Sequence, residues 1–229
     1  LEQSIECLQT AIAVLQRLQE SPSIKRLMRA ALDLGNMVNF QYGRSTRRSK
    51  VRGFKLSTLA SLKSVYSLDR EMNLLDYLAF SLRDRHPECL LVADEFPELE
   101  SLASADINVI IDHIKTVQSK VDQAKYARGV KPSPSVSKFK SEILDFIHAS
   151  EKLMSSANKT VTSFNRAFEQ ALCYFGEEDQ STKPSDTFRN FLDFTVYLRD
   201  AHNRIADTAS KSGIMCELRS QSSLSSLTD

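Results

Sequence analysis

Histidine and cysteine are the residues best able to bind a metal ion or act as a nucleophile, and in this 229-residue chain they are scattered. They lie at His86, His113, His148, His202, Cys7, Cys89, Cys173 and Cys216. No pair has a CxxC or HExxH spacing, and there is no glycine-rich phosphate loop or GxSxG motif. His113 and His148 fall near helical faces, where a structural role is favoured over a ligand role, and Cys173 is expected in a helix core. We therefore expect no catalytic residue, no metal site and no cofactor.

A cluster of like charges is the strongest local feature of the chain. It has six basic residues within twelve positions and no acidic residue between them: Arg44, Arg47, Arg48, Lys50, Arg52 and Lys55. The formal net charge of the chain is only +1, so the excess is local. The cluster is either a solvated loop or a contact for an acidic surface of a nucleic acid or a protein. Nucleic acid is disfavoured because the nearby aromatics Phe40, Tyr42 and Phe54 match no stacking or recognition motif.

The composition is ordinary for a globular protein, with 41% apolar and 26% charged residues. Only 6 Gly and 6 Pro occur, which favours helices over a turn-rich β fold. No apolar run approaches the ~18 residues of a membrane span. The few scattered cysteines indicate a reducing, cytosolic compartment. The N-terminus has no signal-peptide character, and the helical pattern already present at Leu1 predicts that the natural protein continues upstream.

Apolar residues at steps of three and four predict helices along most of the chain. In the first third they predict helices over 1–18 and 22–39, a loop over 40–53 and a short helix over 56–62. The second helix has Ser21 as its predicted N-cap and Pro22 in its first turn. Ser67 is predicted to cap the next helix, with Leu68 on its apolar face, and Pro87 to close it.

Two long helices, at about 98–127 and 138–176, are predicted to dominate the rest, and the second is of coiled-coil length. The linker between them contains Pro132 and Pro134, so the two helices most simply fold back antiparallel. A last helix is predicted near 188–205, and the Ser-rich tail at 211–229 is expected to be disordered. The expected fold is all-α: an elongated helical bundle with long antiparallel helices and a compact helical cluster at one end.

The segment from Gly35 to Leu78 resembles the signature of the formin homology-2 domain. That family reads approximately G-N-x-x-N, then G-F-K-L-x-x-L, then S-x-D, then T-L-L-H-[YF]-[LI]. This chain has, in the same order, Gly35-Asn36-Met37-Val38-Asn39, Gly53-Phe54-Lys55-Leu56-Ser57-Thr58-Leu59, Ser67-Leu68-Asp69 and Leu74-Leu75-Asp76-Tyr77-Leu78. Each motif alone is weak, but their order and spacing together are specific. A weaker likeness continues through His86-Pro87-Glu88 and Tyr174-Phe175-Gly176-Glu177, to about Asn203.

The chain departs from this family pattern at a few positions. Met37-Val38 stands where the family often has Tyr-Met, and Val65-Tyr66 where it often has Thr-Lys. Asn73 replaces the usual Thr and Asp76 the usual His. These departures leave the expected fold intact and bear on the strength of contacts with actin or a partner.

The resemblance implies an actin-binding module without catalytic residues, located in the cytoplasm and on the cytoskeleton. In the family the domain runs from lasso through linker, knob and coiled coil to post, and two subunits join when each lasso wraps the other's post. The resulting ring nucleates actin filaments and holds their barbed ends. Residues 1–210 resemble the coiled coil and the post, with the post formed around 24–90. We expect the chain alone to be unable to form the ring, and to be monomeric or to dimerise through another surface.

Site residues follow from the matching motifs. Gly35, Asn36 and Asn39 correspond to the post motif near which the lasso docks, with Gly53 and Phe54 in the next motif of the post. A helix end, with Asn and Gly satisfying the turn, explains the first three residues equally well. Phe54 and Leu56 are expected in the core. Lys55 matches a lysine on an actin-facing surface, so the predicted actin contact comprises Lys55, Arg52, Lys50, Arg48, Arg47 and Arg44.

Two other classes of function compete with this interpretation. A helical coiled-coil scaffold or adaptor would use the long antiparallel helices to bind partner helices. Such a scaffold has no need of the Gly35 to Leu78 block, which favours the formin interpretation. An enzyme is disfavoured because no nucleophile, metal or phosphate constellation is present. Nucleic acid and a membrane span are not expected.

Overall fold

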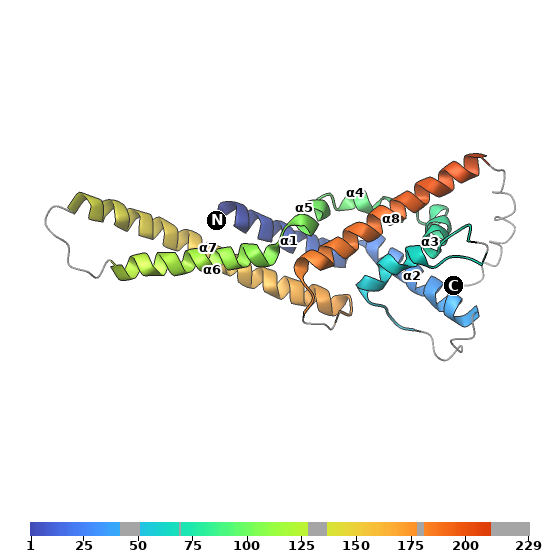
Figure 1. The fold of residues 1–229 in the computed structure, drawn as a ribbon, viewed down its shortest axis with the longest axis horizontal. Helices are drawn as coiled ribbons and strands as arrows, with labels where there is room; N and C mark the ends of the chain where they lie inside the picture. Colours follow the sequence, from blue (N-terminus) through green and yellow to red (C-terminus); the bar gives the residue numbers. More distant parts are fainter. Residues whose placement is uncertain (42–50, 69, 128–136, 178–180, 212–229) are drawn as a thin grey trace. The chain divides into compact units, whose positions relative to one another are not determined.

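The computed structural model describes residues 1–41, 51–68, 70–127, 137–177 and 181–211 (Figure 1). Within these ranges the chain is helical and has no strand, which confirms the predicted all-α class. The elements are α1 (Glu2–Glu20), α2 (Pro22–Gln41), η1 (Leu56–Ser64), α3 (Leu74–Arg83), η2 (Pro87–Leu91), α4 (Val92–Glu95), α5 (Leu99–Ser104), α6 (Ile107–Ala127), α7 (Ser137–Tyr174) and α8 (Pro184–Lys211), where η marks a 3₁₀ helix. They divide into two compact units. The first comprises Leu1–Ser21 and Pro97–Arg189, and the second comprises Pro22–Phe96 and Asn190–Asp229.

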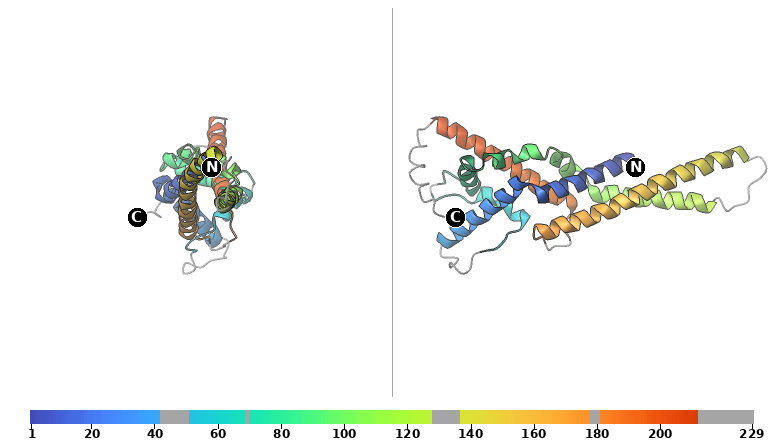
Figure 2. Two further views of the ribbon diagram at one scale, coloured as in Figure 1. Left: turned by 90° about the vertical axis from the view of Figure 1, so that its left-hand side faces the viewer. Right: turned by 180° about the vertical axis from the view of Figure 1, so that it is seen from behind.

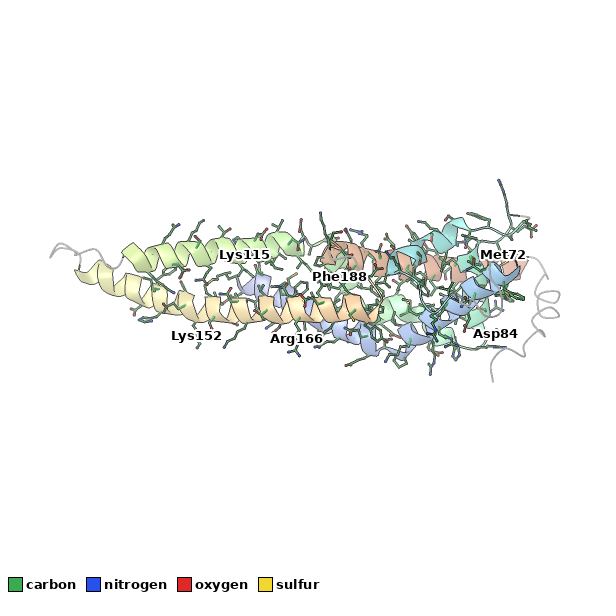
Figure 3. All side chains as sticks on the ribbon, turned by 90° about the horizontal axis from the view of Figure 1, so that it is seen from below. Met72, Asp84, Lys115, Lys152, Arg166 and Phe188 are labelled. Atoms are coloured by element: carbon green, nitrogen blue, oxygen red, sulfur yellow. The ribbon has the colours of Figure 1, made fainter. Side chains whose placement is uncertain are left out.

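The first unit is built on α7, against which α1 and α6 pack (Figure 2). As predicted, α6 and α7 lie antiparallel. Each helix contributes one apolar stripe at helical spacing. The stripe of α1 includes Leu8, Leu15 and Leu18, all fully buried, while α7 buries Ala157 and Phe164. The polar faces stay in solvent, as Figure 3 shows for Lys115 of α6 and for Lys152 and Arg166 of α7.

A polar network fixes how α6 and α7 pair. Gln118 of α6 accepts a hydrogen bond from Asn158 of α7 at 3.0 Å and donates to both carboxylate oxygens of Asp122 at 2.9 Å. Lys125 of α6 forms ion pairs with Asp122 at 3.4 Å and with Glu151 of α7 at 3.2 Å. The hydrogen bond to Glu151 raises the pKa of Lys125, and the hydrogen bond from Gln118 lowers the pKa of Asp122. Polar cross-helix contacts of this kind specify register.

The core of the second unit includes apolar side chains of α2, α3 and α8. Phe191 and Phe194 of α8 are fully buried, as are Leu27 of α2 and Leu78 of α3. The predicted last helix is therefore present, and it extends over Pro184–Lys211 with a proline in its first turn. The basic residues between Arg44 and Lys55 and most of the family-like motifs belong to this unit. Its core therefore supports the candidate site.

Several predicted boundaries differ from the structure. The prediction that Ser67 caps a helix with Leu68 on its apolar face is wrong, because α3 begins at Leu74 and Leu68 is 92% exposed. Asn73 takes the cap position, since its side chain accepts the main-chain N–H of Asp76. The long helix expected from 98 begins at Ile107, because Ala105 is extended and ends α5 at Ser104. Cys173 is exposed rather than in a core.

Parts of three predictions lie outside the described residues. They are the residues 42–50 of the loop, 128–136 of the linker and 212–229 of the tail. The predicted extent of the domain, 1–210, and of the post, around 24–90, stay predictions. None of the described helices has an apolar stretch long enough to cross a lipid bilayer.

Candidate binding site

Asn36 joins two of the segments singled out in the sequence. Its side-chain amide donates to the carbonyl oxygen of Val51 at 3.0 Å, and its Oδ1 accepts the main-chain N–H of Val51 at 2.8 Å. This reciprocal pair holds Val51, the residue before Arg52, against α2. Asn36 therefore has a structural role, because it fixes one residue of the basic segment (residues 44–55) to the helix.

Gly35 lies inside α2 and does not end it. The interpretation of Gly35, Asn36 and Asn39 as a helix end is wrong, since α2 continues to Gln41. A glycine inside a helix costs about 1 kcal/mol relative to alanine. Among the residues that the structure describes, none requires that loss, because a Cβ added at Gly35 would meet none of their atoms within 4 Å. Asn39, half-buried, lies one turn further along the same face. This face is open to a close-approaching partner.

Most residues from Arg52 to Lys55 are exposed, and they lead into a 3₁₀ helix. Arg52, Gly53 and Lys55 are exposed, while Phe54 is half-buried rather than a full core residue. The carbonyl oxygen of Lys55 accepts the main-chain N–H of Thr58 at 2.9 Å and its hydroxyl at 2.5 Å. The 3₁₀ helix η1 that follows is anchored by two buried leucines, Leu56 and Leu59. Lys55 is thus presented to solvent from a rigid base.

The other predicted basic residues are not described. Arg44, Arg47, Arg48 and Lys50 lie outside the described residues, so their positions relative to Lys55 stay predictions. The structure brings Asn36 together with the residue before Arg52. Lys55 lies four residues after Val51, immediately before η1.

A capping box at the start of α3 accounts for two of the departures from the family pattern. The main-chain N–H of Asp76 donates to Oδ1 of Asn73 at 2.8 Å, and the main-chain N–H of Asn73 donates to Oδ2 of Asp76 at 3.0 Å. Two main-chain amides at the helix start are satisfied in this way. Asn73 and Asp76 are therefore a matched pair. The N-x-x-D spacing was the available signal for it, and the sequence prediction did not use it.

Arg204 of α8 completes this cluster. Its Nη2 donates to Oδ1 of Asp76 at 2.6 Å, across 128 positions of sequence. The side chain of Asp76 is only 11% exposed, whereas that of Arg204 is 55% exposed. A charge-assisted hydrogen bond to a largely buried carboxylate is stronger than a surface pair. No local pattern identifies such a partner so far away.

The His86-Pro87-Glu88 motif has a structural role. Glu88 forms an ion pair with Arg26 of α2 at 2.9 Å and lies 3.2 Å from Nδ1 of His86. A hydrogen bond from its own main-chain amide, followed by interactions with His86 and Arg26, lowers the pKa of Glu88. The next residue, Cys89, is buried and donates to the carbonyl oxygen of Ser23 at 3.6 Å. Burial raises the pKa of its thiol to about 11. The motif holds η2 against α2.

The family model described as Formin Homology 2 Domain matches residues 1–198 of the 229. The chain belongs to the formin homology-2 family. The match includes every motif quoted above, so the resemblance predicted from the Gly35 to Leu78 segment is confirmed. In this formin homology-2 chain, Asn73 and Asp76 lie inside the matched range, and Arg204 lies beyond it.

Curated relatives agree with the family match. Formin-like protein 3 of Danio rerio is 26% identical over 194 residues, which is 85% of this chain and 17% of that protein. Formin-H of Dictyostelium discoideum is 30% identical over 186 residues, or 77% of this chain and 16% of that protein. Disheveled-associated activator of morphogenesis 1 of Mus musculus is 25% identical over 186 residues. The chain therefore spans about a sixth of the length of these formins.

In the part of this formin segment that the structure describes, no group of three or more His, Cys, Asp or Glu side chains is placed to hold a metal ion. The residues that stand out are exposed side chains of the second unit. They form an open helix face at Gly35 and a basic stretch at Arg52 and Lys55. Both are suited to contact with another protein.

Proposed function

We propose that this chain is the coiled-coil and post segment of a formin homology-2 domain that binds actin. Joined to its lasso and knob regions, it contributes to filament nucleation and to barbed-end binding and elongation. The observation that carries the proposal is Lys55. It occupies the lysine position of the G-F-K-L motif, is exposed, and stands on a main chain fixed by Thr58. The proposal places the protein in the cytoplasm, on the cytoskeleton.

The basic segment is the proposed actin contact. Lys55 and Arg52 are both exposed, and the other four basic residues of the segment precede them in the sequence. A concentrated positive charge attracts an acidic protein surface and mainly raises the association rate, in a manner that salt screens. The two buried leucines of η1 keep this charge on a rigid element, which limits the entropy lost on binding.

The α2 face at Gly35 is the proposed docking site for the lasso of a second subunit. The glycine leaves open space that an approaching chain can fill, and Asn39 provides an amide one turn away. Met37 and Phe40, which are 37% and 52% exposed, lie on other sides of α2 and are not part of this face. Asn36 contributes by holding Val51, which lies within the basic segment next to Arg52.

Actin assembly distinguishes this function from the scaffold alternative. An intact domain that carries this segment with its lasso and knob is expected to accelerate pyrene-actin assembly well above the spontaneous rate. The 229-residue chain alone is expected to nucleate weakly or not at all, because the ring cannot close without the lasso. Robust nucleation by the isolated chain would contradict this division of roles. An intact domain that leaves actin assembly unchanged would favour a helical scaffold.

A further inference from the structure

The hydrogen bonds around Asn73 connect α8 to two exposed tyrosines. Arg204 binds Asp76, and Asp76 and Asn73 cap each other. Asn73 forms an antiparallel bridge with Tyr66, and its carbonyl oxygen accepts the main-chain N–H of Tyr77 at 3.1 Å. The bridge itself is made by the neighbours of Asn73, because the N–H of Ser67 donates to the carbonyl oxygen of Met72 and the N–H of Leu74 donates to that of Val65, both at 2.8 Å. The Tyr66 segment is therefore held next to Asn73, and Tyr77 is held on the main chain of Asn73.

Three cationic contacts place α8 in the second unit, and they differ in strength. Lys63 lies over the ring of Tyr197 at 3.7 Å, and both side chains are accessible. Arg199 is 3.8 Å from Asp94, with 45% and 67% of the two side chains exposed, so solvent screens the pair. Only the Arg204 contact uses a carboxylate that is largely buried and shared with a helix cap. Its loss leaves that carboxylate without its cationic partner.

The tyrosines are exposed although their main chain is well ordered by hydrogen bonds. Tyr66 is 55% and Tyr77 is 43% exposed. The N–H of Leu74 donates to the carbonyl oxygen of Val65 at 2.8 Å, which closes the segment next to Tyr66. Tyrosine with an apolar ring and a polar tip is enriched at protein interfaces and is frequent among their energetic anchors. A rigid base reduces the entropy such an anchor loses on binding.

Tyr66 lies within reach of a protein bound at Lys55. Between Lys55 and Tyr66 the chain is mostly η1, a nine-residue 3₁₀ helix. At ~2.0 Å per residue that helix spans ~18 Å. An interface of ordinary size covers ~800 Å² on each partner, which is a patch ~30 Å across. One partner contacting Lys55 can therefore also cover Tyr66.

We propose that Tyr66 and Tyr77 form a second contact with the actin bound by the basic segment, and that Arg204 is the positioning residue that holds them. The proposal rests on the proposed function. It adds Arg204, in the last part of α8 and beyond residue 198 where the family match ends, to the residues that support the actin contact. It also explains why Asn73 and Asp76 occur together. The carboxylate of Asp76 accepts hydrogen bonds from the main-chain amide of Asn73 and from the guanidinium of Arg204.

The positioning role is tested by amide hydrogen exchange in the 229-residue chain. Arg204→Gln removes the guanidinium, and Asp76→Asn keeps an oxygen for the Asn73 amide while removing the charge. Each change is expected to speed exchange of the Leu74 and Tyr77 amides roughly tenfold. The double variant should exchange no faster than either single variant, because both changes remove the same contact between Arg204 and Asp76. Arg204→Lys should restore most of the protection, and the control Arg199→Gln should leave it unchanged. Additive effects, or no effect of either variant, would overturn the positioning role.

The contact is tested by barbed-end affinity of the intact domain. Tyr66→Ser and Tyr77→Ser are each expected to weaken binding about tenfold, and Arg204→Gln to weaken it severalfold with recovery in Arg204→Lys. Helix content by circular dichroism should stay unchanged in all four variants. If Lys55→Asp weakens binding while both tyrosine variants bind normally, this inference fails and the proposed function stands. If none of these variants, Lys55→Asp included, weakens binding, the proposed function itself fails.

Discussion

Replacing Gly35 with leucine is expected to prevent a second formin subunit from docking while leaving the chain at least as stable as before. A Cβ added at this position meets no atom of the described residues within 4 Å, so the leucine side chain is expected to project into the space proposed for the lasso. Steric overpacking of this kind costs ~1–3 kcal/mol, or up to roughly a hundredfold in dimer affinity. The folded chain gains, because the helical penalty of glycine, about 1 kcal/mol, is removed.

Two measurements separate these effects. Sedimentation equilibrium of the intact domain gives the dimer dissociation constant, and thermal unfolding of the 229-residue chain gives the stability. The matched control is Ala30→Leu, at a half-exposed position of α2 that lies about 140° around the helix from Gly35. Unchanged dimerisation in Gly35→Leu would show that the lasso does not dock on this face. A fall in stability would show that the space at Gly35 is needed by the fold.

Replacing Phe191 with alanine is expected to destabilise the second unit severely. Phe191 of α8 is fully buried. Loss of a buried phenyl ring typically costs ~3–5 kcal/mol, a large part of the ~5–15 kcal/mol by which domains are stable. The midpoint of urea unfolding, followed by circular dichroism, should fall accordingly.

The matched control for this change is the same substitution at an exposed ring. Phe146 of α7 is 66% exposed, so Phe146→Ala removes little buried surface. A surface change of this kind is expected to alter stability by no more than ~0.5 kcal/mol. Similar effects at the two positions would mean that α8 does not provide the core of the second unit.

Apolar spacing was enough to predict most helices, and family motifs were enough to predict the site segment. The stripes of α1, α6 and α7 follow the 3.6-residue period, and two prolines between the long helices indicated the reversal. Lys55 was found because the G-F-K-L motif surrounds it. Apolar spacing, prolines and short motifs are local features of the chain, so they can be identified from a single sequence.

The errors arose where tertiary contacts decide between local alternatives. Ser67 and Asn73 are both good N-caps, and Asn73 caps α3 in a cluster that also includes Asp76 and the distant Arg204. The second helix was predicted to end near Asn39 with Gly35 and Asn36 satisfying its last turn, whereas both residues lie inside α2, which continues to Gln41. The break at Ala105 has no glycine or proline to mark it. A partner 128 positions away cannot be identified from spacing alone.

The barbed-end affinity of Lys55→Asp in the intact domain tests the central claim most directly. The control is Lys152→Asp, which makes the same charge change at an exposed lysine of α7 (Figure 3). We predict that Lys55→Asp binds barbed ends at least roughly tenfold more weakly, with a smaller salt dependence, because an attractive charge contact has become repulsive. Lys152→Asp should bind within about twofold of the unchanged domain, since it lies outside the proposed contact. Unchanged binding by Lys55→Asp, or equal loss in both variants, would contradict the assignment of the basic segment to actin.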